Sequence, residues 1–344
     1  MSSTKERIEY FDILRGIAIF AVVAIHVSGV GLKFDADSFN FNFTILWRNA
    51  LNFCVPLFVV ISGYFLANKD LSGKSDYIDF LKKQISKIYF PMLIWSSVWL
   101  LINVLVFQSS FPKELVKLLA FSSSVPYYFV ALIIQFYLVL PLLQRVVSKS
   151  MLCISIGVSL SMTIFVFYIR YYQNINLPVV VYGGNLFTYI MFFTLGLYMG
   201  KNSIAHLSGK ALFCVTLICY ALSCIESYAL IEAFGQVGDS VTAIKPSSFL
   251  YSFFFIIFLF RMKGRISSII LSKVGRMSFG IYLTHLFLLM FVTKIISRFY
   301  PSLFSITALY QLLVTVLIVS GCYLAMRVFN DRVSNKVGVR LGFF

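Results

Sequence analysis

The chain has 344 residues, of which 60% are hydrophobic and only 12% charged, and its net charge is +16. A soluble domain carries about a quarter charged residues, so this composition excludes a soluble protein and indicates a polytopic membrane protein. The six cysteines all lie within apolar runs. They therefore predict buried packing residues, with no disulfide framework and no metal site.

Hydropathy divides the chain into apolar runs of spanning length. There are about ten, at residues 11–30, 47–66, 90–107, 127–143, 151–169, 185–199, 211–231, 246–260, 277–296 and 309–326. We expect an all-α fold, a single integral membrane domain over residues 1–344 with about ten transmembrane helices. An even number of crossings places both termini on one side of the membrane.

The distribution of lysine and arginine predicts which side that is. With the N-terminus inside, the inner segments carry 20 basic residues, while the outer segments carry 6: Lys33, Lys113, Lys117, Arg170, Lys245 and Arg298. This asymmetry predicts both termini in the cytoplasm. The net positive charge is thus explained by membrane topology, and the basic residues also attract anionic membrane lipid. We expect no nucleic-acid partner.

The connecting segments are short. In the first inner segment, residues 67–89, apolar residues recur at spacings of 3 and 4, which predicts a helix lying on the membrane surface. The outer loops, including 31–46 and 108–126, are too small for an extra domain. The tail after residue 326 is expected to be a short basic stub.

Two ionisable residues stand out in the first span, Arg15 and His26. Eleven helical steps of about 100° overshoot three turns by only about 20°, so both side chains project from one face, about 16 Å apart along the axis. An ionisable residue within a span usually faces a protein interior and marks function. Arginine near a helix end also snorkels to the interface, and Asp12, one turn earlier, could simply be its partner.

Histidine is the side chain best suited to take a proton from an alcohol at neutral pH, which makes His26 a candidate general base. His285 lies in the ninth span, with Tyr282 and Ser278 on the same face. His285 or Tyr282 could orient His26 or stabilise an oxyanion. The alternatives are a core histidine for His26 and interhelical hydrogen bonding for His285.

Five segments resemble, in order, the motifs of the acyltransferase-3 family of bacterial integral membrane acyltransferases. They are FDILRGIAIFAVVAIH at 11–26, VPLFVVISGYFL at 55–66, YFVALIIQFYLVLPLL at 128–143, FFTLGLYMGK at 192–201 and SFGIYLTH at 278–285. The family's arginine and histidine map onto Arg15 and His26. The chain is most similar to the short single-domain subgroup that resembles the enterobacterial common antigen O-acetyltransferase.

This resemblance implies a function in the bacterial cytoplasmic (inner) membrane. Members transfer an acyl group, commonly acetyl from acetyl-CoA, to a hydroxyl of a surface polysaccharide or its lipid-linked, undecaprenyl-type precursor. No metal is implied, and a homo-oligomer is possible. Arg15 would then meet the phosphates of CoA, because its guanidinium suits bidentate contacts.

Asp12, Arg48 and Ser62 complete the residues expected at the donor site. Arg48 is a candidate substitute for a family arginine where this chain has Asn52, although interface snorkelling is its default interpretation. Ser62 is also a candidate nucleophile, but a serine before Gly63 is more often part of a close helix contact. Two other functions stay open: a carrier or flippase for lipid-linked sugars, and a structural partner of an assembly complex.

Overall fold

The computed structural model describes residues 2–202 and 208–344, and its regular elements within these ranges are all helical. The predicted all-α class is confirmed. Contacts divide the chain into a first unit, Met1–Phe58 with Ile204–Val328, and a second unit, Val59–Ser203 with Phe329–Phe344. The single functional domain over residues 1–344 stays a prediction. The third histidine, His206, for which we predict no role, lies outside the described residues.

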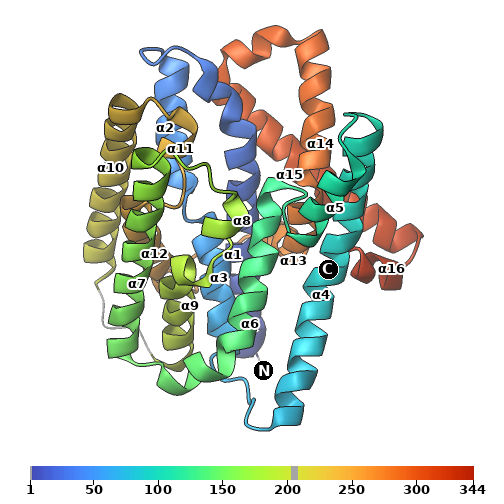
Figure 1. Ribbon diagram of the computed structural model, residues 1–344. Coiled ribbons are helices and arrows are strands. Elements are labelled where there is room, and N and C mark those ends of the chain that lie inside the picture. The colour runs from blue at the N-terminus through green and yellow to red at the C-terminus, as the bar shows by residue number, and fades with distance from the viewer. Residues whose placement is uncertain (1, 203–207) are drawn as a thin grey trace. The chain divides into compact units, whose positions relative to one another are not determined.

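The elements are labelled along the chain in Figure 1. The first unit contains α1 (Ser2–Val27), η1 (Ser28–Lys33), α2 (Phe39–Leu51), α10 (Gly209–Phe234), α11 (Val237–Ser240), α12 (Pro246–Arg261), α13 (Ile269–Arg276), α14 (Ser278–Phe299), η4 (Pro301–Ser305) and most of α15 (Thr307–Arg332). The second unit contains most of α3 (Cys54–Leu66), then α4 (Lys74–Leu105), α5 (Phe111–Leu119), η2 (Val125–Tyr127), α6 (Tyr128–Val146), α7 (Lys149–Phe167), η3 (Tyr168–Tyr172), α8 (Val179–Tyr182), α9 (Leu186–Lys201) and α16 (Asn335–Arg340).

All ten predicted apolar segments are helical. Among the described residues, 8 helices are long and apolar enough to cross a membrane, and α9 and α12 are shorter apolar helices. Each of these two has 16 residues, fewer than the roughly 20 that a straight crossing needs. The chain is therefore a multi-pass membrane protein.

Glycines set the distance between α1 and α13 in the first unit. A Cβ atom at Gly16 would overlap the carbonyl oxygen of Leu271, and one at Gly275 would overlap that of Asp12. The two backbones can approach this closely only because both positions lack a side chain. The sequence pattern had placed residues 261–276 in an inner connection and did not predict α13.

A second close contact joins α3 and α9 in the second unit. A Cβ atom at Gly63 would overlap the carbonyl oxygen of Phe193, and one at Gly196 would overlap that of Val60. This is the small-residue packing that membrane helices use in place of hydrophobic association. The glycine pair in the predicted 192–201 motif thus has a direct structural role.

Two predicted helix boundaries are wrong, because both were placed from hydropathy alone. The second apolar helix region begins at Phe39, eight residues before the predicted start, because Ser38 caps α2 by accepting from the Phe41 amide. The predicted surface helix within 67–89 is not separate, since it continues into the next span as α4, a single helix of 32 residues (Figure 1). Hydropathy marks where polar side chains begin, and a helix can continue beyond that point.

The C-terminal tail is folded against α4, which corrects the prediction of a basic stub. The Trp95 indole donates a 3.1 Å hydrogen bond to the carbonyl of Leu341. Phe343 is buried, with its ring centroid 6.1 Å from that of Trp95 and 5.6 Å from that of Phe329. Aromatic contacts therefore hold the end of the chain in the second unit.

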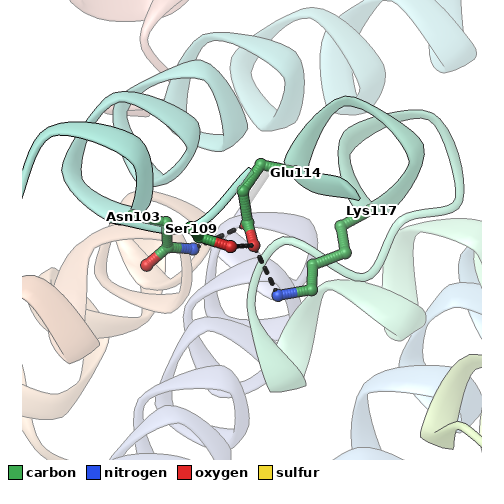
Figure 2. Close-up of polar contacts among 4 residues, drawn as sticks. All are labelled: Asn103, Ser109, Glu114 and Lys117. Carbon is green, nitrogen blue, oxygen red and sulfur yellow. Dashed lines mark hydrogen bonds and ion pairs between the residues drawn. The ribbon is translucent and has the colours of Figure 1, made fainter. Parts of the chain in front are cut away.

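The predicted outer loop 108–126 contains α5, which is tied to α4 by the buried carboxylate of Glu114 (Figure 2). This carboxylate accepts from Asn103 at 2.8 Å, Ser109 at 2.8 Å and Lys117 at 2.7 Å. Burial opposes the charged form, but these hydrogen bonds outweigh it and lower the pKa of Glu114. The loop is thus a fixed turn.

The contact between α1 and α13 can be tested with one methyl group. We expect Gly16→Ala to lower the thermal midpoint of the detergent-solubilised protein, because the methyl must displace the backbone of Leu271; overpacking of this kind costs about 1–3 kcal/mol. The control is Gly157→Ala in α7, where a Cβ atom meets nothing within 4 Å. Equal midpoints for the two variants would contradict the close approach.

Candidate active site

Helix α1 carries both ionisable residues that the sequence singled out. Arg15 lies in its middle with a side chain that is 33% exposed, and His26 lies in its last turn and is half-buried. The α1 helix also packs against α14, which carries His285. The three residues therefore belong to one compact unit of the molecule.

His285 is fully buried and its ring is held by the backbone of its own helix. Its Nδ1 atom lies 2.8 Å from the carbonyl oxygen of Tyr282 and 3.1 Å from that of Ile281. A ring nitrogen this close to two acceptors is assigned the proton, which leaves the lone pair on Nε2. Within the part of the chain that the structure describes, this Nε2 atom has no hydrogen-bond partner.

The structure brings His26 and His285 together, although 259 positions separate them in the sequence. Their ring centroids are 5.2 Å apart and the ring planes are inclined by 47°. His26 is partly exposed, whereas His285 is fully buried. The pair is thus asymmetric: His26 keeps some exposed surface, whereas His285 has none and is held in a fixed tautomer.

Arg48 reaches the same pair from α2. Its Nη1 atom donates to the carbonyl of Ile25 at 2.8 Å and to the Ser28 hydroxyl at 3.1 Å, and it interacts electrostatically with His26. These contacts favour a site role for Arg48 over its default interpretation as an interface anchor. The contact with Ile25 also caps the C-terminal end of α1, where a cation interacts favourably with the last carbonyl groups.

Arg15, on the same predicted helix face as His26, forms an ion pair. Arg15 donates to the buried carboxylate of Asp12 at 2.8 Å, the i, i+3 contact that the sequence allowed. Arg276, at the end of α13, also interacts electrostatically with this carboxylate. The close packing of α13 on α1 therefore places a second cation beside the Asp12–Arg15 pair.

Two predicted site residues have positions that differ from the expectation. The Tyr282 contact with His285 runs through its backbone carbonyl, while its ring stacks on Phe279 with centroids 6.1 Å apart. Ser62 lies on α3 in the second unit, directly before the close-packed Gly63. This environment supports the packing interpretation of Ser62.

Sequence reasoning missed a buried polar network in the first unit. The ammonium of Lys245 is fully buried and donates to the carbonyl of Ser223 at 2.6 Å and to the hydroxyl of Ser227 at 2.5 Å. Asn49, beside Arg48 on α2, donates to Ser227 at 2.9 Å and accepts from the Ser223 hydroxyl at 2.7 Å. Burial lowers the pKa of Lys245 to about 8.

Part of this network had a sequence signal. Asn49 and Asn52 are three residues apart and Ser223 and Ser227 are four apart, so each pair shares one helix face. Asn52 is buried and donates to Ser248 at 3.0 Å, which explains its place in the network. Lys245 had no such signal, because only the tertiary fold turns a loop lysine inward.

Comparison with known proteins identifies the family. A family model described as an acyltransferase domain matches residues 8–327. The chain belongs to the acyltransferase-3 family. No curated protein and no solved structure matches it. The matched range includes most of α1 and all of α2 and α14, and thus His26, Arg48 and His285. This membrane acyltransferase is therefore expected to catalyse group transfer, which disfavours the carrier alternative.

The role of the Nε2 lone pair of His285 can be tested by substitution. In His285→Asn the amide nitrogen can take the place of Nδ1 and donate to Tyr282, but the Nε2 lone pair is lost. We expect the variant to keep its thermal midpoint within a few degrees, while acyl transfer in isolated membranes falls about 100-fold or more. Near-normal transfer would reduce His285 to interhelical packing.

Proposed function

We propose that this membrane acyltransferase is an acyl-CoA-dependent O-acyltransferase. It moves an acyl group, most simply acetyl from acetyl-CoA, to a hydroxyl of a cell-surface polysaccharide or its lipid-linked precursor. The observation that carries the proposal is the contact between His26 and His285, with the rings 5.2 Å apart and the tautomer of His285 fixed by the backbone. Oxygen nucleophiles need a base of this kind at neutral pH.

In the proposed reaction His26 takes the proton of the acceptor hydroxyl, while the hydroxyl oxygen forms a bond to the carbonyl carbon of the thioester. The tetrahedral intermediate then collapses, the carbon–sulfur bond breaks, and the imidazolium returns the proton to the CoA sulfur. The products are an ester and a free thiol, with no net change in protons or electrons. A transient acyl-imidazole on His26 is the covalent alternative and would use the same residue.

The neighbouring groups have complementary roles in this proposal. Nε2 of His285 would accept the N–H of His26 once the two rings close to hydrogen-bonding distance during the reaction, because the Nδ1 side is already committed to Tyr282. Arg48, held at Ile25 and Ser28, supplies a positive charge where the oxyanion develops. Arg15, still partly exposed beside Asp12, contacts the donor phosphates.

The setting of the reaction follows from the charge distribution. With both termini in the cytoplasm, as the basic residues predict, Arg15 lies on the cytoplasmic side of His26, which is about 16 Å further along the helix axis. A cytoplasmic CoA donor could then present its thioester at His26 through the extended pantetheine arm. This arrangement suits the inner membrane of a bacterium and an acceptor of the common-antigen type, as the sequence motifs suggest.

The proposal is tested by His26→Gln. This variant keeps a polar side chain but cannot take up a proton at neutral pH, so transfer should fall by about 10²–10⁴-fold. Membranes are incubated with radiolabelled acetyl-CoA, and release of free CoA thiol and label in the glycolipid fraction are both measured. A variant that inserts normally and retains most of the activity would exclude His26 as base and as acyl carrier.

The donor role of Arg15 predicts a different kinetic change. Arg15→Lys keeps the charge and the pairing with Asp12 but loses the bidentate fork, so KM for acetyl-CoA should rise about tenfold with little change in kcat. The matched control is Arg265→Lys at an exposed position, which should leave both constants unchanged. An unaltered KM in Arg15→Lys would make Arg15 a structural partner of Asp12 only.

A further inference from the structure

The second unit contains a pocket that the proposed reaction does not use. It has a volume of about 470 Å³, within the range of roughly 300–1,000 Å³ that small-molecule sites occupy. It lies among the start of α4, the segment before it and the C-terminal half of α6. The residues that matter for its chemistry are Lys74, Tyr77, Leu138, Leu142 and Arg145.

The walls of this pocket are fixed by hydrogen bonds. The hydroxyl of Tyr77 donates to the carbonyl of Leu138 at 2.7 Å and so joins α4 to α6. The side-chain amide of Gln144 donates to the carbonyls of Leu66 at 2.7 Å and Lys69 at 3.0 Å, which secures the segment that leads to α4. The pocket is therefore preformed and would lose little conformational freedom on binding a ligand.

Two exposed cations flank the pocket, Lys74 and Arg145. Among the described residues, neither is part of an ion pair. The nearby acids are occupied locally: Asp70 accepts from the amide and the hydroxyl of Ser72, which lower the pKa of its carboxyl, and the carboxylate of Asp76 lies against Gly73 of its own helix start. Lys74 and Arg145 are therefore not paired with these acids, although the carboxylates of Asp70 and Asp76 offset part of their charge.

The opposite wall is apolar. Leu138 and Leu142, one helical turn apart on α6, are 51% and 63% exposed, and Pro141 lies between them in the lining. In a membrane protein such a stripe faces acyl chains. Positive charge beside an exposed leucine stripe matches a ligand that has a phosphate at one end and hydrocarbon at the other.

We propose that this pocket binds one anionic glycerophospholipid, with its headgroup phosphate between Lys74 and Arg145 and its acyl chains along Leu138 and Leu142. Basic pockets beside membrane helices suit this chemistry, since guanidinium and ammonium groups both pair with phosphate. A water-soluble phosphate such as CoA would use only the charged side and would leave the leucine stripe uncovered. The proposal does not rest on the chemistry of the histidine pair, which belongs to the first unit.

The test measures lipid binding by the full-length protein. Native mass spectrometry follows retention of phosphatidylglycerol by the wild type and by the double variant Lys74→Gln/Arg145→Gln. The matched control, Lys82→Gln/Lys83→Gln, removes the same charge from exposed positions of α4 outside the pocket lining. Two phosphate contacts should be worth on the order of 10–30-fold in affinity, so the pocket variant should lose that much and the control less than about threefold.

Further measurements distinguish a lipid headgroup from a water-soluble phosphate as the ligand of the pocket. Phosphatidylcholine, which has no net charge, should bind equally to all three proteins, and millimolar CoA or glycerol phosphate should not displace phosphatidylglycerol. Equal losses in the two double variants would show general attraction to anionic lipid and overturn the site. Displacement by CoA that depends on Lys74 and Arg145 would assign the pocket to the donor and also overturn it. If the double variant does not fold, each single substitution is measured against Lys82→Gln.

Discussion

Within a bilayer no water is available to hydrogen-bond a polar group, so each polar group in a span must find its partner within the protein. This constraint explains the backbone contacts of His285 and the reach of Arg48 to Ile25. The pairing of Arg15 with Asp12 has the same cause. In each case a side chain that is costly in hydrocarbon is stabilised by a carbonyl or a carboxylate of a neighbouring turn or helix.

The same contacts determine the tautomer of His285 and make the two histidines different. Two carbonyl oxygens occupy the Nδ1 side of His285, and this determines which nitrogen keeps a lone pair. The ring centroid of His26 lies 5.2 Å away, and His26 is the member of the pair that keeps some exposed surface. A structural requirement, the hydrogen bonding of a buried ring nitrogen, thus creates the asymmetry that the proposed acid–base catalysis would use.

Close helix contacts position these groups. Gly16 and Gly275 allow the α1 and α13 backbones to touch, which places Arg276 beside the Asp12–Arg15 pair. The buried ammonium of Lys245 and the side chain of Asn49 fasten α2, so that the preceding residue, Arg48, can reach α1. A buried lysine is costly unless it is hydrogen-bonded, and its partners on α10 meet that requirement.

Length, hydropathy and the asymmetry of basic residues were sufficient to predict an all-helical multi-pass protein, because burial in lipid leaves a chain few alternatives. The motifs likewise indicated the acyltransferase family and the candidate residues His26 and His285. Hydropathy could not predict that α4 is continuous, that α2 starts at Phe39 or that α13 exists, because it reports polarity and carries no information on helix ends. The pairing of His26 with His285 and the inward direction of Arg48 and Lys245 were decided by the tertiary structure, since each requires helices distant in sequence to meet.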